Sequence, residues 1–192
     1  MAKVTSPSER LSKRKVQPGH NREWRSSEED FVKVARMVLD QSKYEVIAAP
    51  TTLRNIIPPD SEYSRSLGIL PEAVIISKAT GKQLFVEVKT QKDEGNAQER
   101  ACRYYTPSFI KFMNKLFGYN YHPFITIFCD QLATKPKFVR KYPLYYEEGT
   151  YMLWVDNDVN AMSVYLNSVC KRWLDPVDSI YLKITKKLKL KK

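Results

Sequence analysis

Two glutamates and a lysine are the residues in this chain whose types and spacing best suit chemistry. Glu87 and Lys89 lie at the end of an apolar run, residues 84–88, and side chains two apart in a strand share a face. A glycine-containing turn separates this run from a similar one over residues 73–76, which predicts an antiparallel hairpin. The hairpin would bring Glu72, at the start of its first strand, near the end of its second strand.

Two carboxylates beside an ammonium suit a divalent cation that acts on a phosphate. Mg²⁺ prefers carboxylate oxygens and keeps several waters, which leaves room for a phosphate group. Lys89 could then position or activate the attacking water and stabilise charge on the phosphorane. However, a glutamate and a lysine two apart on the polar face of a strand are common, and most form a solvated ion pair of little energetic value. These residues alone leave a catalytic and a structural interpretation open.

Buried strands are expected to hold these residues in place. The runs 73–76 and 84–88 are nearly continuously apolar, as expected of central strands covered on both faces. Further strands are predicted over residues 124–129 and 151–155, and an extended segment is predicted from Tyr44 onward. The candidate site is therefore placed on rigid elements.

Three amphipathic helices are predicted outside these strands. Residues 26–30 contain a capping box, and Pro107 and Gly118 mark the start and the stop of a second helix. Residues 135–140 form a basic loop suited to phosphate contacts, or a solvated charge run. The side chains expected to be buried are Phe31, Val34, Ala35, Val38 and Leu39 in the first helix, Phe109, Ile110, Met113 and Leu116 in the second, and Met162, Val164, Tyr165, Val169 and Trp173 in the last.

The stretch that follows Lys89 also has two interpretations. Asn96 followed by Glu99 is an ordinary helix start, with the asparagine as N-cap and the glutamate at the third helical position. The same residue types suit base reading, because asparagine pairs with an adenine edge, Arg100 can donate to adenine N7, and glutamate accepts from exocyclic amines. Ala97 is small enough to let the backbone approach DNA, and its methyl group can touch thymine.

Taken together, these motifs resemble the active site and recognition helix of the EcoRI and MunI family of type II restriction endonucleases, within the PD-(D/E)xK nuclease superfamily. The similarity covers roughly residues 43–155. It implies an α/β, restriction-endonuclease-like fold in which a central mixed β-sheet is flanked by α-helices. The residues that carry it are Pro71-Glu72, Glu87-Val88-Lys89, Gln91 and Gly95-Asn96-Ala97-Gln98-Glu99-Arg100.

The resemblance implies Mg²⁺-dependent hydrolysis of double-stranded DNA at a palindromic site centred on AATT, which leaves 5′ phosphates and 5′-AATT overhangs. Mg²⁺ would be held by Glu72, Glu87 and the carbonyl of Val88, and Lys89 would position or activate the water. A palindromic site implies a homodimer, and a restriction enzyme needs a companion adenine DNA methyltransferase to protect host DNA. DNA contacts are implied for Gln91, Asn96, Ala97, Glu99, Arg100 and Arg103.

Two features depart from the family pattern. The first acid of the family's P-D pair is Glu72, which is one methylene longer and can bind Mg²⁺ from a slightly retracted backbone. The connection from Lys89 to Gly95 is shorter than in MunI, where a longer loop supplies an arginine for the outer base pair. Residues 93–94 are acidic and cannot replace it. Because guanine is read by arginine or lysine, we expect relaxed recognition outside AATT unless another basic side chain, such as Lys92, restores it.

Basic charge is concentrated at the two ends of the chain. The net charge of the 192 residues is +11, with +5 in residues 1–25 and +6 in residues 183–192, so residues 26–182 are formally neutral. We therefore predict a basic flexible N-terminal arm (1–25), a single endonuclease domain (26–182) and a lysine-rich C-terminal tail (183–192). Such tails improve solubility or add salt-dependent affinity for phosphates, and a DNA enzyme favours the second role.

Cysteine usage and hydropathy indicate a cytoplasmic protein. The three cysteines, Cys102, Cys129 and Cys170, are widely spaced and fit reduced thiols better than disulfides or a zinc site. No apolar run is long enough to span a bilayer, and the first 25 residues lack the apolar core of a signal peptide.

Two other functions stay open at this point. A non-specific or repair-type nuclease of the same superfamily could use the same catalytic strand, because no residue before Gly95 excludes it. A catalytically lapsed, sequence-specific DNA-binding protein is the second alternative, with Glu72 as the mark of the lapsed site. Cleavage in the presence of Mg²⁺ would distinguish the nucleases from the lapsed protein.

Overall fold

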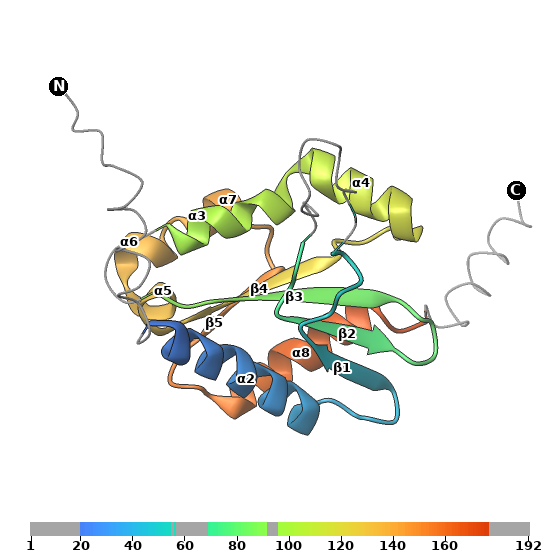
Figure 1. The fold of residues 1–192 in the computed structure, drawn as a ribbon, viewed down its shortest axis with the longest axis horizontal. Helices are drawn as coiled ribbons and strands as arrows, with labels where there is room; N and C mark the ends of the chain where they lie inside the picture. Colours follow the sequence, from blue (N-terminus) through green and yellow to red (C-terminus); the bar gives the residue numbers. More distant parts are fainter. Residues whose placement is uncertain (1–19, 55, 57–68, 92–95, 177–192) are drawn as a thin grey trace, which may run out of the picture.

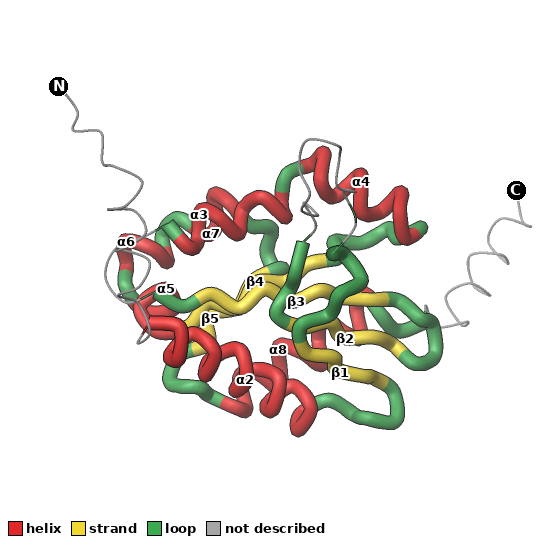
Figure 2. The backbone as a smooth tube through the Cα atoms, viewed as in Figure 1, coloured by secondary structure: helices red, strands yellow, loops and turns green. Residues whose placement is uncertain are grey.

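A five-stranded mixed β-sheet lies at the centre of the computed structural model, which describes residues 20–54, 56, 69–91 and 96–176 (Figures 1 and 2). The strand order β1-β2-β3-β4-β5 follows the chain. The first three strands pair antiparallel, and β3, β4 and β5 pair parallel. The strands are β1 (Tyr44–Ala48), β2 (Ala73–Ser77), β3 (Gln83–Lys89), β4 (Phe124–Cys129) and β5 (Tyr151–Trp154). The predicted hairpin and the predicted mixed sheet are both confirmed.

Helices cover both faces of this sheet (Figure 1). Two longer helices, α2 (His20–Val38) and α8 (Val159–Trp173), lie on one face. The remaining helices lie on the other face or beyond the ends of the parallel strands. They are α3 (Ala97–Ala101), the 3-10 helix η1 (Cys102–Tyr105), α4 (Pro107–Phe117), α5 (Asp130–Thr134), α6 (Pro136–Val139) and α7 (Tyr142–Tyr145).

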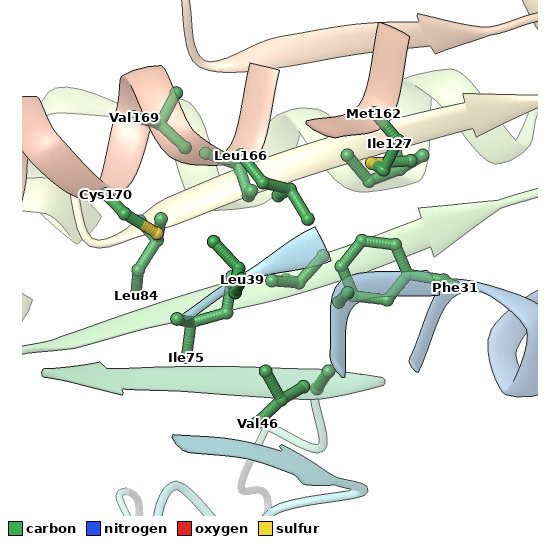
Figure 3. Close-up of a cluster of buried hydrophobic side chains, with 14 of the residues drawn as sticks. Phe31, Leu39, Val46, Ile75, Leu84, Ile127, Met162, Leu166, Val169 and Cys170 are labelled. Atoms are coloured by element: carbon green, nitrogen blue, oxygen red, sulfur yellow. The ribbon is translucent and has the colours of Figure 1, made fainter. Parts of the chain in front are cut away.

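The main core fills the space between the sheet and the pair α2 and α8. Figure 3 shows Leu39, just after α2, beside Ile75 of β2, and Cys170 of α8 beside Leu84 of β3, with Phe31 of α2 in the same cluster. Alternate residues of β3 enter this core, because Leu84, Val86 and Val88 share one face of the strand. The prediction that the two valines point away from Glu87 and Lys89 is thereby confirmed.

The opposite face of β3 packs under η1 and α4. Phe85 is fully buried there, and the ring of Tyr104 from η1 stacks on Phe124 of β4 at a centroid distance of 4.5 Å. Since Glu87 shares a face with Phe85, its carboxylate is directed into this second layer. One face of β3 is therefore entirely apolar and anchors the strand in the main core. The other face carries the buried Phe85, followed by Glu87 and Lys89.

Helix boundaries differ from prediction in two places. Helix α2 begins at His20 and not near residue 26, so the predicted capping box lies inside the helix. The breakers Pro18 and Gly19 lie just before the observed start. The basic segment 135–140 is not a loop, because a short helix, α6, occupies most of it. The predicted arm up to residue 19 and the tail from residue 183 lie outside the described residues.

Two of the predicted core positions were wrong. Leu116 is 54% exposed and Val164 is 74% exposed. At 100° per residue, Val164 lies on the far side of its helix from Met162, whereas the fully buried Leu166 and Cys170 continue the inward stripe. In α4 the inward position is taken by Phe117, four residues after Met113.

The three cysteines are free, and two of them, Cys129 and Cys170, are buried. Among the described residues, no helix has the length and apolar character required to cross a membrane.

Candidate active site

Glu72, Glu87 and Lys89 meet at one end of the β2–β3 hairpin. The Nζ atom of Lys89 lies 2.5 Å from Oε1 of Glu87 and 3.1 Å from Oε1 of Glu72. It also donates a hydrogen bond to the carbonyl of Val88 at 3.3 Å. All three side chains are largely buried, with 4% of Glu87 and 14% of each of the other two exposed. The structure therefore brings together the residues that the hairpin pattern predicted, while their catalytic roles stay a prediction.

Backbone pairing fixes the position of Glu72. Its N–H donates to the carbonyl of Val86 at 3.1 Å, which extends the β2–β3 pairing by one residue. Its carboxylate then reaches along β3, where Oε2 accepts from the N–H of Val88 at 3.2 Å. The additional methylene of glutamate is accommodated in this way, with the carboxylate bonded to the backbone of the strand that carries Lys89.

The electrostatics of the cluster follow from two acids and one base in a buried space. Burial, and next the charge of Glu87, raise the pKa of Glu72 to about 9, against the opposing effect of Lys89. Burial acts to lower the pKa of Lys89, but the charges of Glu87 and Glu72 outweigh it and raise that pKa. With both acids ionised the cluster carries one net negative charge. It therefore favours a proton or an added cation.

The oxygen atoms of the cluster fit a hard divalent cation. Oε2 of Glu87 is buried and has no hydrogen-bond partner among the described residues, so its lone pairs are open to a ligand. The carboxylate of Glu72 and the carbonyl of Val88 lie beside it through their shared contacts with Lys89. Carboxylate and carbonyl oxygens are the donors that Mg²⁺ prefers. The described residues contain no group of three or more His, Cys, Asp and Glu side chains suited to a metal, so this candidate rests on two carboxylates and a carbonyl.

Helix α3 follows β3 along the chain and presents polar side chains to solvent. Asn96, Glu99 and Arg100 are exposed, whereas Ala97 is buried against neighbours such as Phe128. Asn96 occupies the N-cap position and Glu99 the third helical position, as the structural interpretation predicted, but the side chain of Asn96 makes no capping hydrogen bond.

Gln91 supplies the missing cap. Its Oε1 accepts a hydrogen bond from the N–H of Ala97 at 3.0 Å, and its side chain is buried. The family resemblance implied a DNA contact for Gln91, and that contact stays a prediction. What the structure adds is a bond from Gln91 to the first residue of the helix.

Arg103 lies in η1 with its guanidinium held by the neighbouring tyrosine. It donates to the hydroxyl of Tyr104 and lies 4.6 Å from the centre of the same ring. Burial, followed by the charge of Glu87, raises the pKa of Tyr104. Tyr104 therefore contacts the exposed guanidinium of Arg103 and also lies within the electrostatic influence of Glu87. Sequence reasoning named Arg103 but missed Tyr104, which resembles an ordinary core aromatic.

Two residues from the segment after β4 fasten α3 on its other side. The hydroxyl of Tyr146 donates to the carbonyl of Gln98 at 2.5 Å, and Lys141 forms a half-exposed ion pair with Glu99 at 3.5 Å. Neither contact could be inferred from spacing, because more than forty residues separate the partners. The basic residues around position 140 were the one feature of the sequence that could have indicated a partner for Glu99.

Comparisons with known proteins agree on one family. The family described as type II restriction enzyme MunI matches residues 6–175 of this chain. A type II restriction enzyme MunI from a Mycoplasma species is 28% identical over 180 residues, which span 78% of this chain and 89% of the relative. The crystal structure of MunI restriction endonuclease in complex with cognate DNA matches with a TM-score of 0.57 at 25% identity, covering 77% of this chain and 96% of that one.

Proposed function

Since this chain belongs to the family of the type II restriction enzyme MunI, and is therefore a type II site-specific deoxyribonuclease, we propose that it cuts double-stranded DNA at a palindromic site centred on AATT, with Mg²⁺ as cofactor. The observation that carries this proposal is the cluster of Glu72, Glu87 and Lys89 at the end of the strand that leads into α3. The exposed polar side chains of α3 lie next along the chain, where a DNA duplex would meet both.

Glu72, Glu87 and the carbonyl of Val88 would hold the metal ion. When bound, Mg²⁺ supplies positive charge that stabilises negative charge developing on the phosphate and the leaving oxygen. Binding of the ion requires Glu72 to be ionised, which its raised pKa opposes in the metal-free protein. The protein's own contribution is a buried set of oxygens. The ammonium of Lys89 contacts these oxygens in the metal-free fold and would move aside when the ion binds.

Lys89 would position or activate the attacking water. In the metal-free fold its ammonium is held by the same two carboxylates, so it lies beside the metal position before DNA arrives. Attack in line with the leaving 3′ oxygen gives a 5′ phosphate and a 3′ hydroxyl. A cut before the first A of AATT on each strand would leave 5′-AATT overhangs.

Sequence reading would come from α3. Asn96, Glu99 and Arg100 are exposed there and have the donors and acceptors that adenine edges require. We assign supporting DNA contacts to Gln91, Ala97 and Arg103. The acidic pair at 93–94, which replaces the expected arginine, lies outside the described residues, and its composition supports relaxed recognition of the outer base pairs.

A palindromic target calls for two copies of the chain related by a two-fold axis. Phe112 and Leu116 are large apolar residues exposed on α4, at 44% and 54%, and this favours a buried role for that helix face in a homodimer. The same proposal implies a companion adenine methyltransferase that protects host DNA, and a cytoplasmic location where the two enzymes meet that DNA.

Digestion of plasmid DNA with Mg²⁺, followed by sequencing of all fragment ends, tests the proposal. Ends that uniformly begin with AATT would support the site, the cut position and the overhang together. Heterogeneous ends would identify a non-specific nuclease instead. Binding to AATT duplexes without cleavage in any divalent metal would identify a lapsed enzyme.

A further inference from the structure

Gln91 links the catalytic strand to the recognition helix. It lies two residues after Lys89, it is 7% exposed, and its Oε1 accepts from the N–H of Ala97 at 3.0 Å. Ala97 is the first residue of α3, whose initial N–H groups have no partner inside the helix. The residue that satisfies this N–H therefore comes from the segment that also carries the candidate catalytic lysine.

Helix α3 depends on such contacts for its position. It has only five residues, and an isolated helix of that length is unstable in water. Its location is set by Gln91 at its start, by the bond from Tyr146 to Gln98, and by packing of Ala97 and Ala101 near Phe128. The contacts of Tyr146 and Phe128 anchor the helix to the body of the protein, whereas the contact of Gln91 connects it to the end of β3.

We propose that Gln91 is a positioning residue that couples DNA reading by α3 to cleavage at Lys89. The inference rests on the proposed function and adds a specificity step to it. When α3 seats on its correct bases, the bond to Ala97 holds Gln91, and with it the end of β3, in the arrangement that aligns Lys89. A mismatched site that displaces α3 would shift the same strand end, and a displacement of about 1 Å can reduce a rate about a hundredfold.

Three variants separate coupling from a general structural role. Gln91→Met keeps the length of the side chain but removes the acceptor, whereas Gln91→Glu keeps an acceptor that also suits the positive end of a helix. Gln83→Met is the matched control, because Gln83 begins the same strand and its buried Oε1 has no hydrogen-bond partner among the described residues. Each variant is tested as full-length protein, with the melting temperature measured to confirm folding.

The readout is the single-turnover cleavage rate at saturating DNA, for an AATT duplex and for a duplex with one altered central base pair. We expect Gln91→Met to lower the cleavage rate on the AATT duplex about tenfold or more. We also expect it to reduce the ratio of the cleavage rate on the AATT duplex to the rate on the altered duplex. Gln91→Glu should recover most of both losses, and Gln83→Met should match the wild type. Because DNA is saturating, a change in affinity alone cannot produce this pattern.

Two results would overturn the inference: wild-type rate and discrimination in Gln91→Met, or equal losses in Gln91→Met and Gln91→Glu. Failure of the wild-type protein to cut any duplex would reject the proposed function separately. Binding of the same duplexes without Mg²⁺ would then test whether Gln91 positions α3. The difference in affinity between the two duplexes must fall in Gln91→Met and return in Gln91→Glu, and an unchanged difference in Gln91→Met would overturn that role.

Discussion

The Nζ atom of Lys89 lies 2.5 Å from Oε1 of Glu87, two residues earlier on the same strand. The strand itself imposes this pairing, because alternate side chains share a face and both residues pair with the neighbouring strand β4. A second acid, Glu72, reaches the same ammonium from the other strand of the hairpin. The lysine is therefore fixed by contacts on two strands, and removal of each partner has a different expected effect.

Replacing Lys89 by alanine should abolish cleavage and leave DNA binding intact. Loss of a group that positions or activates the nucleophile typically costs about 10² to 10⁴ in rate, whereas the reading residues of α3 are untouched. Cleavage in Mg²⁺ and binding without Mg²⁺ should be measured on the same AATT duplex. Lys78→Ala, an exposed lysine at the opposite end of the hairpin, is the control and should behave as wild type. Full activity of Lys89→Ala would refute the site assignment.

Two substitutions of Glu72 test separately whether cleavage requires a carboxylate and whether it requires the length of the glutamate side chain. Glu72→Gln should lose nearly all cleavage, because a neutral amide is a poor ligand for Mg²⁺. Glu72→Asp restores the family's usual acid, and we expect it to keep cleavage within about tenfold of wild type, since the backbone can approach by one methylene. Rates at several Mg²⁺ concentrations would check both expectations. A fully active Glu72→Gln would remove Glu72 from the proposed metal site.

The stability of the metal-free protein should fall as pH rises from about 4.5 to about 9. Burial and the charge of Glu87 raise the pKa of Glu72 from 4.5 to about 9, so the folded state binds more protons than the unfolded state between these values. Stability decreases with pH wherever the folded state holds the additional proton. The raised pKa of Lys89 stabilises the fold below its ordinary value of 10.5 and changes nothing within this window.

Thermal melts in a chelator, at a series of pH values, would measure this slope. Glu72→Gln should flatten it, because the amide cannot ionise, and adding Mg²⁺ to the wild type should offset it, because the ion favours the charged carboxylate. If stability depends on pH equally in wild type and Glu72→Gln, the pKa of Glu72 is not raised in the metal-free fold.

Arg100→Ala should lose specific binding. Arg100 is exposed on α3, and removal of a side chain that reads a base edge costs about 1–3 kcal/mol of discrimination. Lys171→Ala removes a comparable exposed charge from α8, on the opposite face of the sheet, and should leave discrimination unchanged. Competition binding of AATT and altered duplexes at constant salt would compare the two variants, and similar losses in both would argue for a general electrostatic effect.

Local patterns predicted the strands and the carboxylate–lysine cluster because the necessary information is local. Continuous apolar runs, a glycine turn and a spacing of two determine the hairpin, and the hairpin alone brings Glu72 to Lys89. The ends of helices were less predictable: residues 20–25 have no strong breaker, so α2 extends back past its apparent capping box.

Contacts between distant segments could not be predicted in the same way. Tyr104 and Tyr146 have the composition of core aromatics, and only the packing of η1 and α7 onto the sheet reveals that one holds Arg103 and the other holds α3. The cap that Gln91 provides was missed for a related reason: Asn96 has the better capping propensity, but its side chain makes no capping bond, and Gln91 accepts from the N–H of Ala97 instead.

Cleavage should depend weakly on the base pairs that flank AATT. Guanine is normally read by arginine or lysine through O6 and N7, and residues 93–94, just before the helix, are acidic. A library of duplexes carrying AATT with every flanking combination, digested in one reaction and sequenced over time, would rank the rates directly. We expect the rates to lie within about tenfold of one another, which corresponds to about 1.4 kcal/mol and is at the low end of the 1–3 kcal/mol of one specific base contact. A duplex with an altered central pair is the control and should stay uncut. Strict dependence on a single outer pair would contradict the prediction and would direct attention to Lys92 as the residue that restores outer reading.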